Sequence, residues 1–453
     1  MDAIFLARAQ FAFTVAFHFL FPALSIGLSW YVFYFMTKYF KSGNEEDAKV
    51  TKFWLKIFTI TFAVGVGTGI TMALQFGTNW ATYTYLVGDI IGAPLAAEVI
   101  LAFFLESTFL AVLIFGWSKV SRRTLWISSF LVAFGTTLSA FWILVVNSWM
   151  QTPAGYYASY DSNGNLIGVQ LADFMAAVFN PSTVVRLLHT VTASIVVASF
   201  FIFGVSSYYK LRNKHEYLVK NSFRTVMIII LISSVALMFF GHLQASVVAE
   251  NQPEKFATYE LVFVTAPAQD QKFPMVAILN PFNGDILFRI DMPFFSLSDY
   301  MLMGSTSYRG LDSFIPDQLP PFVLTVYSFH FMILLGLLFI AFGFIGTVLF
   351  YKNRIYEDKI YNKLFLALGV IAIPFPFIAV QLGWMAAEVG RQPWIVYGLL
   401  KTSDAISVSV PEWQILMSLI LFVSIYVILF ILWVTLLVKT ILKGPEEISV
   451  SEV

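Results

Sequence analysis

Nine long apolar stretches dominate this chain of 453 residues and restrict its fold more than any other feature. A helix needs roughly 20 such residues to cross the hydrocarbon core of a bilayer. Because a backbone in lipid must satisfy its own hydrogen bonds, the default structure for each stretch is an α-helix. We therefore expect an all-α polytopic membrane protein with about nine transmembrane helices. The predicted spans are 11–38, 54–78, 94–117, 125–149, 183–209, 222–247, 321–351, 364–387 and 413–442.

Composition supports a membrane protein and excludes several other classes. The chain is 58% hydrophobic and only 12% charged, about half the charge that a water-facing surface needs. The formal net charge is zero, which gives no electrostatic footprint for nucleic acid. Cysteine is absent, so disulfides, thiolate metal sites and covalent c-type haem attachment are excluded.

Basic residues alternate between the predicted connections. Lys and Arg gather after the first, third, fifth, seventh and ninth spans, whereas connections 79–93 and 150–182 contain none. Because cytoplasmic loops carry an excess of Lys and Arg, the N-terminus is predicted outside and the C-terminus in the cytoplasm.

One predicted connection, 248–320, is much longer than the others. Loops of this length are usually functional or partly disordered. We see no internal repeat and no separate soluble domain, so we expect a single transmembrane domain over 1–453 with one large external loop.

Ionisable side chains inside the spans are functional-site candidates, because they are costly in lipid. At 1.5 Å per residue, five polar or sulfur-bearing side chains lie within about 17 Å of the outer surface. These are His18, Glu98, His189, Met332 and Glu388. A lone histidine of this kind is more often an interhelical hydrogen-bonding group than a ligand.

Three arginines lie near the same depth, and their presence makes a ligand role for the histidines more plausible than it would be for a lone histidine. They are Arg8, Arg186 and Arg391. Imidazole for iron and guanidinium for propionates are what a buried haem requires. Arg186 is three residues from His189 and shares its helix face, although it also fits a residue that snorkels at a helix end.

Glu98 and Glu106 are eight residues apart on the third span. This spacing places them about 12 Å apart along the helix and within roughly 80° of one face. Buried carboxyl groups that stay neutral can exchange protons, so the pair suggests a proton relay. The alternative is a structural hydrogen-bonding pair.

Six segments carry a more specific signal than hydropathy does. They are RAQFAFTVAFHFLFPALSIG (8–27), GTNW (77–80), GAPLAAEVILAFFLEST (92–108), LSAFWILVVNSWMQTPAG (138–155), QPEKFATYE (252–260) and GRQPW (390–394). In this order they closely resemble subunit I of the cytochrome bd-type quinol oxidases. The resemblance extends from Arg8 to about the ninth span.

The resemblance implies a terminal respiratory enzyme in a prokaryotic plasma membrane, which oxidises membrane quinol and reduces dioxygen to water without copper. The implied cofactors are a low-spin haem b, a high-spin haem b, and a haem d or a further haem b in its place. A second membrane subunit is the implied partner, with a small single-span subunit as a further candidate. Protons taken from the cytoplasm would generate membrane potential without pumping.

The resemblance also assigns residues by motif. His18 and Glu388 match axial ligands of the oxygen-reducing haem pair, and Glu98 matches the acid beside it. His189 and Met332 match the ligands of the low-spin haem b. Three further groups follow. The proton route takes Glu106 and Ser139, the quinol site takes Lys255 and Glu260, and the haem surroundings take Trp384, Arg391 and Trp394. For Lys255 and Glu260 the alternative is a solvated ion pair in a polar loop.

Two positions depart from the family pattern. His330 stands where the family usually has an arginine near a propionate, and His242 stands where an acid is common. His330 and Met332 are two residues apart, about 200° around a helix, so they cannot both face one iron. Ligand chemistry alone favours His330, whereas the aligned motif favours Met332, which we assign.

Other classes fit less well. A haem–copper oxidase needs a cluster of histidines, and the five here are scattered. A transporter would show repeat symmetry and broken helices near the midplane, and we expect neither. A family variant with only b-type haems remains an alternative.

Overall fold

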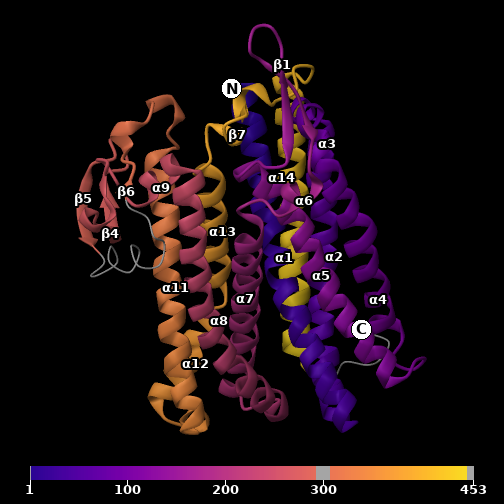
Figure 1. Cartoon of the computed structure of the whole chain (residues 1–453). Coiled ribbons are helices and arrows are strands. Elements are labelled where there is room, and N and C mark those ends of the chain that lie inside the picture. The colour runs from indigo at the N-terminus through magenta and orange to yellow at the C-terminus, as the bar shows by residue number, and fades with distance from the viewer. Residues whose placement is uncertain (1, 292–306, 446–453) are drawn as a thin grey trace.

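The computed structural model describes residues 2–291 and 307–445, and it consists mainly of long helices that run side by side (Figure 1). Seven long helices are α1 (Ala3–Ser42), α2 (Glu45–Gly77), α5 (Arg122–Gln151), α7 (Thr183–Leu211), α8 (Glu216–Asn251), α11 (Phe322–Tyr351) and α14 (Glu412–Lys443). An eighth combines α3 (Ala81–Ala97), a π-helical turn η1 (Glu98–Phe103) and α4 (Phe104–Phe115). The described residues thus contain eight helices that are long and apolar enough to cross a membrane.

A ninth span is divided. Helices α12 (Ile360–Ile371) and α13 (Pro374–Val389) meet at a 42° bend. Pro374 lies at the start of α13, and proline lacks the N–H that would continue the helical ladder. The number of predicted spans is confirmed, but the expectation of unbroken helices was wrong at this position.

Several helices extend beyond the predicted spans. Helix α2 begins nine residues before residue 54 because Asn44 caps it, its side chain accepting a bond from the Glu46 N–H at 3.0 Å, and acidic residues in a first helical turn are favourable. The predicted connection 79–93 is largely helical, since α3 begins at Ala81. Apolar stretches mark the part of a helix in lipid and not its ends.

The helices pack through large side chains near the bundle centre. Helix α1 packs on α2 and α7 on α8, with Trp54, Phe58, Phe200 and Phe203 buried between them. The outward faces of α4 and α14 remain exposed, which is expected where lipid or another chain covers them.

Short elements cap one end of the bundle. They are β1 (Tyr156–Tyr160), β2 (Leu166–Leu171), α6 (Phe174–Val178), α9 (Pro253–Tyr259), β3 (Ala266–Pro267), β4 (Pro274–Leu279), β5 (Ile286–Asp291), β6 (Ser307–Tyr308), β7 (Trp394–Val396) and β8 (Leu400–Lys401). The strands pair as antiparallel β1–β2, β3–β6, β4–β5 and β7–β8. Part of the predicted external loop, 292–306, lies outside the described residues. The rest folds into α9, strands and short turns and is not an irregular segment.

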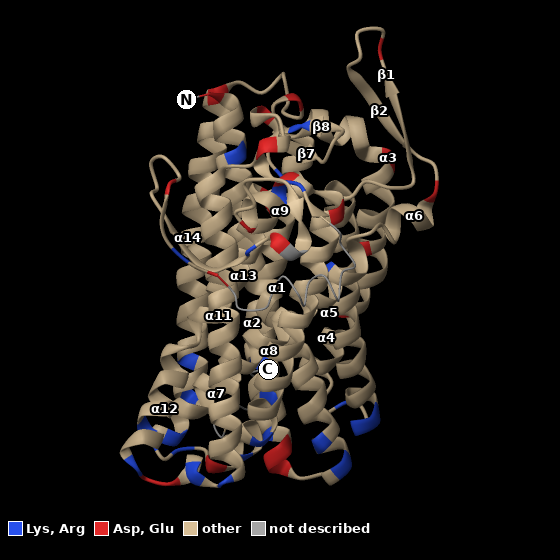
Figure 2. Cartoon of the chain, turned by 60° about the vertical axis from the view of Figure 1, so that its left-hand side comes forward, with Lys and Arg blue, Asp and Glu red and all other residues tan. Residues whose placement is uncertain are grey.

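Charge is distributed unevenly along the bundle. Figure 2 shows Lys and Arg gathered at the end opposite to α9 and the β1–β2 hairpin. This arrangement is the one the predicted orientation requires, with the basic end in the cytoplasm.

Candidate functional site

Glu388, in the last turn of α13, is the centre of a polar cluster near the capped end. Its Oε1 accepts hydrogen bonds from Asn147 Nδ2 at 2.9 Å and Gln151 Nε2 at 3.1 Å. Its Oε2 forms an ion pair with Arg391. Arg186 NH1 donates to Asn147 Oδ1 at 3.2 Å, so α5, α7 and α13 meet through this carboxylate.

Lys255 joins the external loop to the same cluster. Its Nζ donates to Ala387 O at 2.8 Å, Gln151 Oε1 at 3.0 Å and Gln252 Oε1 at 3.2 Å. Gln151 therefore bridges Lys255 and Glu388. Burial holds the pKa of Lys255 well below its usual range; Arg186 adds to this lowering and Glu388 opposes it.

The alternative of a solvated ion pair at Lys255 and Glu260 was wrong. These side chains are only 2% and 3% exposed. Helix α9 packs against α8 and α11, and Tyr259 OH donates to Ala386 O of α13 at 2.6 Å. The segment is predicted to be external, yet it is buried in the fold, because Phe256, Ala257 and Tyr259 pack in an apolar cluster and Lys255 bonds to the spans.

His330 and Met332 face different partners. His330 Nε2 donates to Tyr259 O at 2.9 Å, which ties α11 to α9, and the Tyr259 ring stacks on Phe329 at 4.3 Å. Met332 instead points to α13, where a Cβ added to Gly383 would stand 2.8 Å from its sulfur. Met332 therefore packs against α13, and His330 is engaged with the loop backbone.

His18 has a fixed ring orientation. Its Nδ1 lies 2.9 Å from Thr68 Oγ1, and that hydroxyl also lies 2.9 Å from Gly65 O and 3.0 Å from Val64 O. The single hydroxyl proton goes to a carbonyl, so Oγ1 accepts from His18 Nδ1–H. Nε2 then keeps its lone pair, as a metal ligand requires.

Two glycines leave room beside the histidine rings. A Cβ at Gly69 would lie 3.2 Å from His18 Cε1, and a Cβ at Gly241 would lie 3.4 Å from His189 Cε1. His189 therefore faces α8, and His18 faces α2. The sequence did not reveal either glycine as a site residue, because glycines are common in apolar spans.

Glu98 and Glu106 both face α5. Ser139 Oγ donates to Glu98 Oε1 at 2.8 Å, and a Cβ at Gly135, one turn away on α5, would lie 3.1 Å from Glu106 Cβ. Two α-helical turns take about 7.2 residues. The π-helical turn η1 absorbs the remaining residue, so the two acids are better aligned than the predicted 80°.

The remaining predicted residues lie around these groups. Arg8 is exposed near the start of α1. Trp384 packs against Phe19 with ring centroids 5.7 Å apart, and Lys401 lies over Trp394 at 5.9 Å. His242 is partly buried in α8. The structure thus joins Arg186, Lys255, Glu388 and Arg391 in one network and Glu98 with Ser139 in another.

Sequence reasoning missed three polar partners: Thr68, Asn147 and Gln151. Asn147 and Gln151 are four residues apart, so they share a helix face, and they lie inside the motif LSAFWILVVNSWMQTPAG. That spacing was the available signal. Only the fold shows that both amides reach Glu388 on another helix.

The donor set fits haem better than a polynuclear metal site. In the described parts of the chain, no three His, Cys, Asp or Glu side chains gather as a metal site. Arg186 Nε and both Nε and NH1 of Arg391 are buried without a hydrogen-bond partner among the described residues. Such donors suit the propionates of a haem. Glu388 also fits, since a carboxylate has about four lone-pair sites and three donors occupy this one.

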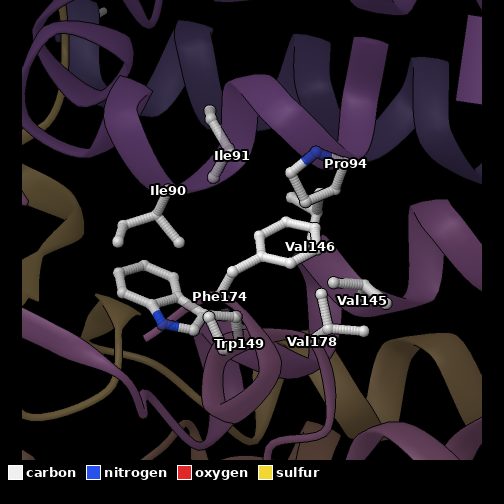
Figure 3. A pocket seen from close by; sticks show the side chains of 9 residues that line it. Ile90, Ile91, Pro94, Val145, Val146, Trp149, Phe174 and Val178 are labelled. Carbon is white, nitrogen blue, oxygen red and sulfur yellow. The ribbon is translucent and has the colours of Figure 1, made fainter. Parts of the chain in front are cut away.

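An apolar pocket between α3, α5 and α6 is a poor candidate for the site (Figure 3). Its walls include Ile90, Val146 and Phe174. The Trp149 indole nitrogen on its wall already donates to Ala154 O at 3.0 Å. The ionisable side chains that could bind a cofactor or exchange protons belong to the cluster around Glu388 and not to this pocket.

Comparison with known proteins assigns the family. The model of the cytochrome bd terminal oxidase subunit I family matches residues 6–445. The chain belongs to this family. It is 37% identical to the cytochrome bd ubiquinol oxidase subunit 1 of Bacillus subtilis over 99% of this chain and 95% of that protein. It is 33% identical to the cytochrome bd-II ubiquinol oxidase subunit 1 of Escherichia coli, over 99% and 98%.

The fold agrees with a solved relative. The bd oxidase structure from Geobacillus thermodenitrificans matches with a TM-score of 0.86 and 26% identity, covering 97% of this chain and 98% of that one. The predicted family is therefore confirmed. Membership implies haem cofactors and at least one further subunit, and with the apolar helices it places the chain in a bacterial plasma membrane as a multi-pass protein.

Proposed function

We propose that this chain oxidises membrane quinol and reduces dioxygen to water, as subunit I of a terminal oxidase. Family membership and the printed activity of the two bacterial relatives support this reaction. The observation that carries the proposal is the buried network in which Gln151 joins Lys255 of the external loop to Glu388. It connects the proposed quinol site to a proposed haem ligand through one side chain.

The proposed iron ligands are His18, His189, Met332 and Glu388. His18 and Glu388 would serve the oxygen-reducing pair, while His189 and Met332 would serve a low-spin haem b. Haem iron supplies electron transfer and dioxygen reduction when bound. We propose three haems and no copper: low-spin b, high-spin b, and d or a further b.

Arginines and tryptophans complete the proposed haem surroundings. Arg186 and Arg391 would hold propionates, and the support is that Arg186 Nε and Arg391 Nε and NH1 are buried donors without an acceptor among the described residues. Arg8, His330, Trp384 and Trp394 are the further proposed contacts.

Quinol would bind at residues 248–320, with Lys255 and Glu260 as the groups that handle its protons. Lys255 Nζ donates to three acceptors, and its lowered pKa means that it would give up a proton more readily than an ordinary lysine and so exchange protons at this site. The external position of the loop would then release that proton outside.

Protons for dioxygen reduction would come from the cytoplasm past Glu106, Glu98 and Ser139. The alignment of both acids toward α5 supports this route. Each elementary charge that crosses the membrane works against about 2.3 kcal/mol per 100 mV, so potential builds without a pump.

The proposed partners are a second membrane subunit and a small single-span subunit.

The purified complex tests this function directly. We expect a reduced-minus-oxidised spectrum with b-type bands, with or without a d-type band, and dioxygen uptake that depends on added quinol. A complex that binds haem but consumes no dioxygen with any quinol would contradict the proposed reaction. A d-type band separates the three-haem enzyme from the variant with only b-type haems.

A further inference from the structure

The β4–β5 hairpin lies against the side of a membrane span. On its inward face, Ala277 and Leu279 are 5% and 1% exposed and pack with Val326 of α11. Tyr327 OH donates to Leu279 O at 2.7 Å and accepts from the Leu279 N–H at 3.0 Å. Tyr327 is five residues into α11, about 7.5 Å from its start. Figure 1 accordingly shows the hairpin beside the outer part of α11.

The outward face of this hairpin is apolar. Ile278 pairs with Phe288 across the strands, and these side chains are 47% and 49% exposed. Ile290 on the same strand as Phe288 is 44% exposed, and Phe282 in the turn is 97% exposed. A hairpin with one face on a core normally carries polar residues on the other. Apolar residues on both faces indicate that something other than water covers the outward one.

The outward face continues a lipid-facing surface of α11. The Tyr327 ring that anchors the hairpin stacks on Phe331 at 5.6 Å. Phe331 is 49% exposed, and Leu324 and Leu338, seven residues to either side, are 44% and 55% exposed. Residues at this spacing share one face of a helix, and on a membrane span that exposed face meets lipid.

The polar side chains of the hairpin lie in its turn and at Arg289 and Asp291 of β5. Asn280, Asn283 and Asp285 bond to one another or to the backbone in the turn. On β5, Arg289 stands between Phe288 and Ile290 in the sequence, lies opposite Ala277 and pairs with Asp291. A segment that combines an exposed apolar face with a polar turn and an ion pair fits the membrane interface.

We infer that the β4–β5 hairpin, residues 274–291, is embedded in the interface of the outer lipid leaflet. Ile278, Phe288 and Ile290 contact acyl chains, and the polar turn lies among headgroups. The consequence for substrate rests on the proposed function. Leu261, next to Glu260, packs with Leu279 on the inward face, so quinol dissolved in the bilayer meets this hairpin before the proposed quinol site.

The absence of cysteine makes the test direct, because each introduced cysteine is unique in this chain. Single variants Phe288→Cys and Ile290→Cys are spin-labelled in the whole complex and reconstituted into lipid nanodiscs. Collision with dioxygen, which concentrates in lipid, is compared with collision with a water-soluble nickel chelate. Leu338→Cys on α11 is the lipid control, and Asn163→Cys in the exposed β1–β2 turn is the water control. The complex without the introduced cysteine is treated with the same spin label, and its signal gives the background from labelling elsewhere in the complex.

We expect both hairpin labels to favour dioxygen over the chelate as Leu338→Cys does, with the opposite preference at Asn163→Cys. A water-like ratio at both positions overturns the inference. Low collision with both reagents also overturns it, because it would mean that another protein chain covers the face. If either variant loses its haem bands, Ile278→Cys, 47% exposed and paired with Phe288 on the outward face, replaces it. Quinol turnover is not measured, so the result is independent of the proposed reaction.

Discussion

At the scale of single residues, the site depends on neutral side chains that orient charged side chains and proposed iron ligands. Thr68 fixes the His18 ring by accepting from Nδ1–H, and Gln151 places an amide between Lys255 and Glu388. Such partners matter because their loss would leave a proposed ligand or a charged group buried without its hydrogen bond.

Replacing Thr68 with valine keeps its shape and removes the acceptor for His18 Nδ1. We expect the haem at His18 to bind about 10–100-fold more weakly, as loss of such hydrogen bonds typically does, with a changed absorption band. The matched control is Thr59→Val, whose hydroxyl bonds only to Leu55 O on the same helix. Equal haem content in the two variants would contradict the assigned ring orientation.

Met332→Leu and His330→Leu separate two explanations for the low-spin haem. Met332→Leu should remove the low-spin signature, because leucine cannot ligate iron. His330→Leu should keep that signature and destabilise the docking of α9 by about 1–3 kcal/mol, since Tyr259 O loses its buried donor. Haem spectra and thermal unfolding of both variants are the measurements. Loss of the low-spin band only in His330→Leu would reverse the assignment.

Lys255→Ala and Glu260→Ala should slow quinol oxidation and leave the haem bands in place. Lys255 is buried among three acceptors, so removing it also leaves Gln151 with one partner fewer. Dioxygen uptake is measured with quinol and with an artificial electron donor that bypasses the loop. The artificial donor should still support turnover. Unchanged quinol kinetics in both variants would place the substrate elsewhere.

At the scale of elements, two irregular segments decide the geometry. The π-helical turn η1 brings Glu98 and Glu106 to one face toward α5. The bend between α12 and α13 sets the direction in which α13 delivers Glu388. Both irregularities occur where a regular helix would aim these groups differently, which is common at functional positions.

Glu106→Gln tests the proton route at this scale. Glutamine keeps the size and hydrogen-bonding ability of this side chain, which is 4% exposed, but it has no acid proton to exchange. We expect normal haem content and loss of most dioxygen reduction, by a factor of about 10²–10⁴ as for a lost proton-transfer group. Oxygen uptake and a potential-sensitive dye are followed together in vesicles. Wild-type rates would show that protons take another path.

At the scale of the whole molecule, charge and shape agree on an orientation. The basic end of the bundle lies opposite to α9 and the β1–β2 hairpin, as Figure 2 shows. In the proposed orientation the Glu388 cluster lies near the outer surface, so protons taken from the cytoplasm would have to cross most of the bilayer.

Labelling with a membrane-impermeant maleimide tests the orientation on intact cells without an outer membrane. Asn163→Cys in the β1–β2 turn should react at once, and Lys214→Cys between α7 and α8 should react only after permeabilisation. Both residues are exposed, so accessibility across the membrane decides the outcome. The reverse pattern would place the N-terminus in the cytoplasm.

The sequence by itself determined the number of spans, the helical class and the residue types of the site. A bilayer forces each apolar stretch to close its own backbone hydrogen bonds, so local composition is sufficient for these features. The six motifs likewise indicated the family before any contact was known. Helix ends were less predictable, because caps such as Asn44 extend helices beyond the lipid.

Only the tertiary structure decided which of those residues meet. Gln151 lies 104 positions from Lys255 and 237 from Glu388, yet it bonds to both. Such contacts depend on the rotation and bending of whole helices, which hydropathy does not encode. The burial of α9 and the position of the β4–β5 hairpin also arise from packing against α11, since a polar-looking loop can fold some of its apolar side chains onto neighbouring spans.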